Sequence, residues 1–339
     1  MTITAPSLGS EEIPADEAQA IATLAAQSEA TMRQKSSHPT RRDQHPKSHG
    51  YALGEFVVAD GLPEAYRVGL FANPGSYACW VRFSNGSSKR NEQGKFFPDA
   101  QKQGDQIVVT PDIRGMAVKV MGVSGEAVPE AEATPGQQDL IMINSPVFFI
   151  RNVVDYLVFF RVKAAIAKGV INLKTQPPVI PEEYGDAVQQ VNYALDLVGK
   201  IQNSEAGVVI SPLQTTFWSA TPYKLGEAAM KFAMVPVTTS FHFDPSQAVD
   251  LEHVFREAIS SQLAQTEAEF DVLVQIQTDA EAMPIEDPTK RWEEGISPYV
   301  KVATLRLPQQ DINTPSRLAA DERQSFSRSE EHTSELQSR

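Results

Sequence analysis

The chain has 339 residues, which is long enough for one large domain or two modest ones with a sizeable core. Its 41% hydrophobic and 22% charged residues are ordinary for a globular protein, and no apolar run approaches the ~20 residues that a membrane helix needs. A net charge of -13 argues against nucleic acid or an anionic membrane as the main partner. The single cysteine excludes an internal disulfide, so we expect a cytoplasmic location.

The N-terminal segment divides into two parts. Residues 1–12 are polar and acidic and are interpreted as a leader without secondary structure. Residues 13–32 carry apolar side chains at helical spacing, which predicts an amphipathic helix. We therefore assign residues 1–35 to an N-terminal leader and helix.

Two strands are predicted next, over residues 48–60 and 78–84. Side chains alternate between the two faces of a strand, so Arg82 and Ser84 share one face while Val81 and Phe83 share the other. The apolar face is expected to pack into a core, and the polar face is available for a site.

Short strands are also predicted over residues 107–110 and 115–120, followed by a strand at 140–143. The last of these is apolar on both faces, which indicates that it is buried. A helix should begin after Asn152 and continue to about Lys168. Asn152 suits the N-cap and Asp155 the first turn, and the apolar circumference of the helix predicts that it is largely buried.

The second half of the chain mixes helices and strands. Helices are predicted over residues 181–200 and 253–267, and strands over 270–276 and 300–307, with a mixed region at 215–236. The strands come first and the helices are interleaved without βα regularity. This order favours an α+β fold with an antiparallel sheet or barrel.

Three sequence blocks in this order resemble the core of the catalase superfamily: residues 81–85, 112–119 and 144–151. A further block at 283–307 resembles the stretch that closes the catalase barrel, so the similarity spans about residues 42–307. The short, single-domain catalase-related proteins are the most similar type. The resemblance implies an α+β fold, with an eight-stranded antiparallel β-barrel, flanking helices and haem beside it, over residues 36–310.

The same resemblance implies roles for individual residues. His45 corresponds to the distal histidine, the acid and base of peroxide cleavage, and Ser84 to the serine that orients it. Asn144 corresponds to the asparagine that donates to the peroxide. His49 is a rival for the role of His45, and a turn residue is the structural alternative for Asn144.

The predicted cofactor contacts are Arg42, Arg82, Phe148 and Phe149. The two arginines correspond to partners of the haem propionates, since a planar guanidinium favours bidentate contact with a carboxylate. A salt bridge or an exposed position is the alternative for Arg82, and core packing is the alternative for the two phenylalanines. Asp112 corresponds to an acidic residue of the access channel, with turn chemistry as its alternative.

Two departures from the catalase pattern limit this interpretation. Gln44 precedes His45 where catalases usually have valine, which weakens the prediction of rapid hydrogen peroxide disproportionation. The iron ligand in catalases is a tyrosine four residues after an arginine, and no tyrosine of this sequence has that spacing. No metal ligand is therefore assigned.

The C-terminal residues are interpreted together with the missing tyrosine. Residues 328–339 match the translation of a common sequencing adapter, so we expect a non-native tail there. Residues 311–327 would then be the start of a truncated C-terminal region.

The resulting functional hypothesis is a haem-dependent peroxidase that acts on hydrogen peroxide or organic hydroperoxides. Two alternatives stay open: an isomerase of fatty-acid hydroperoxides similar to allene oxide synthase, and a non-catalytic haem-binding protein of the catalase fold. The expected partner is the peroxide substrate, with neither nucleic acid nor a membrane span, and a homo-oligomer is left open. Activity of the truncated chain itself does not follow from this hypothesis.

Overall fold

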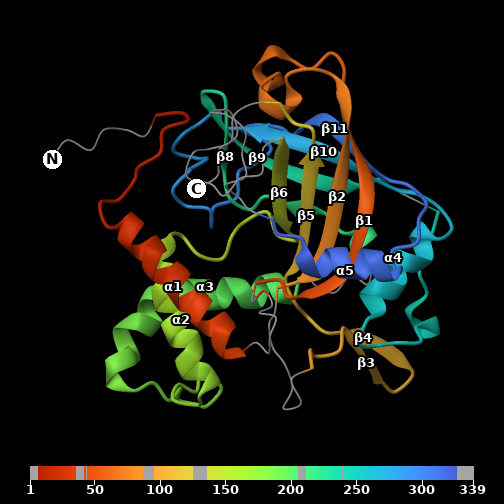
Figure 1. Cartoon of the computed structure of the whole chain (residues 1–339). Helices are drawn as coiled ribbons and strands as arrows, with labels where there is room; N and C mark the ends of the chain where they lie inside the picture. The colour runs from red at the N-terminus through yellow and green to blue at the C-terminus, as the bar shows by residue number, and fades with distance from the viewer. Residues whose placement is uncertain are drawn as a thin grey trace.

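The computed structural model describes residues 7–35, 42, 44–86, 95–124, 136–204, 211–237 and 240–326. Within them, eight strands close into an antiparallel barrel in the order β10-β11-β1-β2-β5-β6-β7-β9, because β9 also pairs with β10 (Figure 1). The barrel strands are β1 (Lys47–Val58), β2 (Gly75–Asn85), β5 (Arg114–Met121), β6 (Gln137–Ile143), β7 (Phe217–Trp218), β9 (Ala228–Pro236), β10 (Ala268–Ile276) and β11 (Val300–Leu307). The predicted α+β barrel is confirmed.

Three further strands lie outside the barrel ring. β8 (Tyr223–Leu225) extends the sheet by pairing with β9. β3 (Ala100–Gln103) and β4 (Gln106–Val109) form a separate hairpin, of which the sequence predicted only the second strand. Because β3 is only four residues long and three of them are exposed, its sequence lacks the alternation that reveals a half-buried strand.

The described helices are α1 (Glu17–Lys35), α2 (Val153–Ala167), α3 (Gly185–Gln202), α4 (Val254–Leu263) and α5 (Pro315–Arg323). Helices α1, α2 and α3 gather on one side of the barrel, where α2 contacts both of the others (Figure 1). Helix α5 crosses the outside of the barrel in contact with β1, and α4 also contacts β1 (Figure 1). None of the described helices is long and apolar enough to span a bilayer.

The barrel interior is filled by large apolar side chains. Val81 and Phe83 of β2 are fully buried there, as the alternation of this strand predicts. Phenylalanines from other strands, such as Phe217 and Phe270, complete the core. Arg82 and Ser84 consequently point outward, where Arg82 contacts α5 and Ser84 contacts His45.

Helix α2 begins where its cap predicts. The Asn152 side chain accepts a hydrogen bond from the Asp155 backbone N–H at 2.9 Å, which satisfies one of the open donors of the first turn. The expectation that the helix is largely buried is wrong on one side. Phe159 and Val162 are buried, whereas Val154 is 38% exposed, because the neighbouring helices cover only part of the circumference.

Candidate functional site

His45 lies two residues before the start of β1, with its backbone in the left-handed region at φ 49°. A residue other than glycine is strained by about 1–3 kcal/mol there, so the surroundings must hold it. The ring atom Nδ1 lies 3.1 Å from Ser84 Oγ, and the backbone oxygen of His45 accepts a hydrogen bond from Arg82 Nη1 at 3.0 Å. The structure therefore brings together the histidine and the serine that the sequence predicted as partners.

Bare backbone forms the surface beneath the imidazole. Gly115 of β5 is paired with Ser84 of β2, and a Cβ placed on Gly115 would overlap ring atoms Nδ1 and Cε1 of His45 and crowd Ser84 Oγ. Gly86 is the next neighbour, where a Cβ would lie 3.6 Å from His45 Cε1. Glycine at position 115 is thus a steric requirement of this ring position.

Asn144 follows β6 and is tied to the strand that carries Gly115. Its side-chain oxygen accepts from the Arg114 backbone N–H at 2.7 Å, and its own backbone N–H donates to the Arg114 carbonyl at 3.0 Å. This arrangement fixes which end of the amide is the acceptor, so the nitrogen end is a donor with a defined direction. Asn144 is 2% exposed, so the orientation is held in a buried position.

Phe148 and Phe149 form an aromatic pair with ring centroids 4.6 Å apart. They pack against Ile113 and Ile143, which border the segments of Gly115 and Asn144, and against helix α2 through Tyr156. The pair is only partly buried. It supplies an apolar wall next to the polar residues, which suits either a cofactor contact or core packing.

Arg82 and Arg42 have protein partners in this structure. Arg82 Nε donates to Asp321 Oδ1 of α5 at 2.8 Å, and both side chains are almost completely buried. Arg42 Nη2 donates to the backbone oxygen of Asp321 at 3.1 Å and also to that of Gln324. Burial, followed by the charge of Arg42, lowers the pKa of Arg82, which is offset in part by Asp321.

The remaining candidates are placed differently from His45. His49 is 1% exposed, lies edge-on to Phe255 at 4.9 Å and has Asp99 as its nearest acidic neighbour, at 3.5 Å. Burial, together with the charges of Arg114 and other cations, places the pKa of His49 well below 6.5, although Asn85 opposes the shift. A neutral histidine inside a packed cluster has the properties of a structural residue.

Asp112 and Gln44 lie at opposite extremes of exposure. Asp112 is 6% exposed, and its carboxylate accepts from the backbone N–H of Ile113 at 2.8 Å, the contact expected of turn chemistry. Its charge also opposes the effect of burial on Arg114, whose pKa is nevertheless lowered to about 10. The side chain of Gln44 is exposed.

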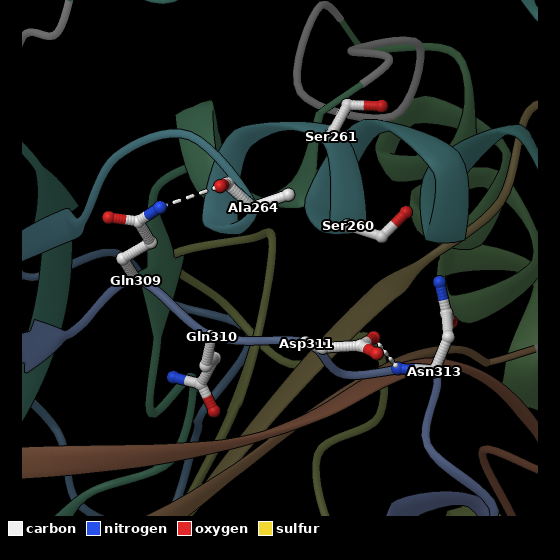
Figure 2. A pocket seen from close by; sticks show the side chains of 7 residues that line it. All are labelled: Ser260, Ser261, Ala264, Gln309, Gln310, Asp311 and Asn313. Atoms are coloured by element: carbon white, nitrogen blue, oxygen red, sulfur yellow. Dashed lines mark hydrogen bonds between the residues drawn. The ribbon is translucent and has the colours of Figure 1, made fainter.

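A groove of about 640 Å³ lies away from these residues, between α4 and the connection from β11 to α5 (Figure 2). Polar side chains that line it form hydrogen bonds with backbone groups of the protein. Gln309 Nε2 donates to the Ala264 carbonyl at 2.8 Å, and Asp311 accepts from the Asn313 backbone N–H at 2.8 Å (Figure 2). The residues that line the groove include none of the predicted site residues.

The residues of the site suit haem on one side only. The side that would face a peroxide fits, because His45 rests on Gly115, Asn144 presents an amide donor and Phe148 and Phe149 provide an apolar wall. The side that would hold iron has no assigned residue, and the described residues contain no group of three His, Cys, Asp or Glu side chains that could hold a metal ion. Arg82, predicted as a propionate partner, is engaged by Asp321.

The closed antiparallel barrel with flanking helices has clear counterparts among known proteins. No protein-family model matches the sequence, and no curated protein is significantly similar to it. Solved structures do match in overall shape, among them catalases from a fungus, a bacterium and yeast. The protein therefore has the catalase fold.

These three catalases each share 18% sequence identity with the chain. The fungal catalase superposes with a TM-score of 0.62 over 99% of this chain and 61% of its own, and catalase A from Saccharomyces cerevisiae with 0.61 over 99% and 64%. The bacterial catalase superposes with a TM-score of 0.56 over 92% and 55%. The chain thus spans about three fifths of the length of the solved catalases it matches.

Sequence reasoning missed the parts played by Gly115 and Asp321. An isolated glycine within an apolar strand is a recognised signal that another group approaches the backbone closely. The role of Gly115 could therefore have been predicted from the sequence. Asp321 lies in a short helix, after two alanines and directly before Glu322 and Arg323, and no local pattern distinguishes it from a solvated residue.

Proposed function

We propose that the protein is a haem-dependent peroxidase of the catalase type, acting on hydrogen peroxide or organic hydroperoxides. The observation that carries the proposal is the contact of His45 with Ser84 above Gly115. Haem, when bound, would supply the redox-active iron. The likeness of the fold to catalases supports the proposal at the level of the fold.

His45 would act as the acid and base. If ring atom Nδ1 carries the proton and its N–H donates a hydrogen bond to Ser84 Oγ, the lone pair lies on Nε2, which is then the basic atom. Nε2 would accept the proton of the inner peroxide oxygen and return it to the outer oxygen as the O–O bond breaks. Ser84 would keep the imidazole in this tautomer.

Asn144 would orient the peroxide. Its side-chain oxygen is held by the Arg114 N–H, so its amide nitrogen would donate to the outer oxygen of the substrate. Phe148 and Phe149 would form the apolar edge that limits access of water. The role of Asn144 follows from the hydrogen-bonding capacity of its buried amide, and that of the two phenylalanines from their apolar rings.

The proposal is tested with the full-length protein and added haem, because no tyrosine among the 339 residues has the spacing of the catalase iron ligand. We expect a Soret band on titration with haem and consumption of hydrogen peroxide or of a fatty-acid hydroperoxide, with oxygen evolution measured separately to distinguish the chemistry. His45→Ala should retain haem and lose about 10²–10⁴ of the turnover, the range for a general acid and base. His49→Gln, four residues further along the chain, provides the control and should retain turnover.

Either of two results would contradict the proposal. Absence of a Soret change would show that the protein does not bind haem. An unchanged rate in His45→Ala would show that His45 is not the acid and base. Loss of turnover in His49→Gln with normal His45→Ala activity would transfer the role to the other histidine.

A further inference from the structure

Asp321 is a buried carboxylate on α5 that is surrounded by arginines from other segments. It is 3% exposed. Arg82 of β2 donates to its Oδ1 at 2.8 Å, and Arg256 of α4 places Nη2 3.9 Å from its Oδ2. Arg42 donates to its backbone oxygen at 3.1 Å. A carboxylate at this depth requires such partners, since an unpaired charge is strongly disfavoured away from water.

Arg82 and Arg256 also hold the backbone of the segment that carries His45. Arg82 Nη1 donates to the carbonyl of His45 at 3.0 Å, and Arg256 Nη2 donates to the carbonyl of Ser48 at 3.2 Å. A guanidinium has five N–H donors in one plane, so it can bridge a carboxylate and a carbonyl without rearrangement. Asp321 is therefore linked to both ends of residues 45–48 through one arginine at each end: Arg82 at His45 and Arg256 at Ser48.

The backbone at His45 needs this support. Its φ of 49° is unfavourable for a residue with a Cβ, and such conformations persist where the surrounding contacts determine them. The imidazole position depends in turn on the backbone, because Ser84 and Gly115 accommodate the ring in a single place. A shift of the His45 carbonyl would move the ring off this surface.

We propose that Asp321 is a positioning residue for His45: its carboxylate orients Arg82, and Arg82 fixes the His45 carbonyl so that the imidazole stays against Ser84. Helix α5 then belongs to the site although it follows the last barrel strand. The inference rests on the proposed function only for the catalytic role of His45. The position of the His45 imidazole is a property of the chain without cofactor.

The test is therefore made on the whole chain without haem. Nitrogen-15 NMR of the imidazole, assigned with a His45→Gln variant, reports the tautomer, and hydrogen exchange reports the protection of the backbone amides of His45, Lys47 and Ser48. Asp321→Ala should convert one dominant His45 tautomer into a mixture and accelerate exchange at these amides by about tenfold or more. Asp321→Asn keeps an acceptor for Arg82 and should produce a smaller change of the same kind.

Arg82→Lys separates positioning from loss of the fold. Lysine keeps the positive charge but presents a single ammonium group, which cannot reach both Asp321 and the His45 carbonyl in the same planar arrangement. We expect Arg82→Lys to remain folded and to reproduce the His45 changes of Asp321→Ala.

Asp139→Asn is the matched control. Asp139 forms an equally buried ion pair with Lys119, at 2.7 Å, on the neighbouring strands β5 and β6. Its removal should lower stability and leave unchanged the His45 tautomer and the exchange of the His45, Lys47 and Ser48 amides. The inference is overturned if folded Arg82→Lys and Asp321→Asn keep the parent His45 signals, or if Asp139→Asn disturbs them to the same degree. Failure of peroxide turnover alone would count against the proposed function and leave these readouts intact.

Discussion

Gly115 lies directly beneath the imidazole of His45, so that a single methyl group at residue 115 would overlap the ring. The register of β2 against β5 places Ser84 opposite Gly115, which puts a hydroxyl and a bare stretch of backbone side by side under the histidine. The Ser84 hydroxyl fixes one nitrogen of the His45 ring, and the absence of a side chain at Gly115 leaves room for the ring. Together they define where the imidazole lies and which nitrogen faces away from the barrel.

Gly115→Ala is the smallest change that tests this relationship. We expect displacement of the His45 ring, a loss of about 1–3 kcal/mol in the free energy of unfolding from overpacking, and a strong fall in any peroxide turnover. Urea unfolding and the His45 NMR signals measure the two effects separately. Gly295→Ala serves as the control, because a Cβ there would meet no atom within 4 Å. A Gly115→Ala protein with parent stability and an unmoved ring would contradict the interpretation.

The local elements of this fold could be predicted because their signals are local. The strand predicted over residues 300–307 matches β11, and the Asn152 cap forms the predicted hydrogen bond to the first turn of α2. The family resemblance correctly indicated the closed barrel. These features depend on alternation, capping and the order of sequence blocks, which are all visible in one sequence.

The contact of Arg82 with Asp321 was not predictable in the same way. The two residues are far apart in the chain, and their side chains meet only because α5 crosses the outside of the barrel at β1. The resemblance suggested a cofactor carboxylate as the partner of Arg82, whereas the structure places a protein carboxylate there. The propionate role of Arg82 stays a prediction, which a haem titration of Arg82→Lys beside the parent chain tests.

Ser84→Ala should weaken the preference for one His45 tautomer. The change removes the hydroxyl 3.1 Å from Nδ1 and leaves the strand otherwise intact, so stability should fall by only about 0.5–1.5 kcal/mol. Turnover should fall less than in His45→Ala, because the base itself is retained. Ser84→Thr keeps the hydroxyl and should restore the tautomer. Ser76→Ala, on the same strand and bonded to Glu55, should leave His45 unaffected.

Asp155 should make the lobe of α2 and α3 sensitive to acid. Burial alone would raise the pKa of this carboxyl, but hydrogen bonds from Tyr193, Gln190 and Arg151 outweigh it and hold the pKa below 3.8. The stabilisation is therefore present above the unfolded-state value and is lost as pH falls through the lower, folded-state value.

Tyr193→Phe removes the shortest of these bonds, at 2.6 Å, so we expect a loss of about 1–2 kcal/mol at neutral pH and a smaller loss once the pH falls through the folded-state pKa of Asp155. Chemical unfolding across this pH range provides the measurement. Tyr184→Phe in the same lobe is the control. An effect of Tyr193→Phe that does not change with pH would show that lost packing, and not the carboxylate, is responsible.

His49 should couple stability to pH near neutrality. Burial and the nearby charges of Arg114, Lys47 and Arg256 place the pKa of this histidine well below 6.5, so the folded protein keeps the ring neutral while the unfolded chain protonates it. The unfolded state then binds more protons below about pH 6.5, and stability falls as pH is lowered by up to about 1.4 kcal/mol per pH unit until the folded-state pKa is reached. Above pH 6.5 the contribution of His49 is constant.

His49→Gln removes the titrating group and should flatten this part of the curve, as measured by urea unfolding between about pH 5 and pH 8. An unchanged slope in His49→Gln would show that another group takes up the proton, and the neutral, structural interpretation of His49 would then be wrong.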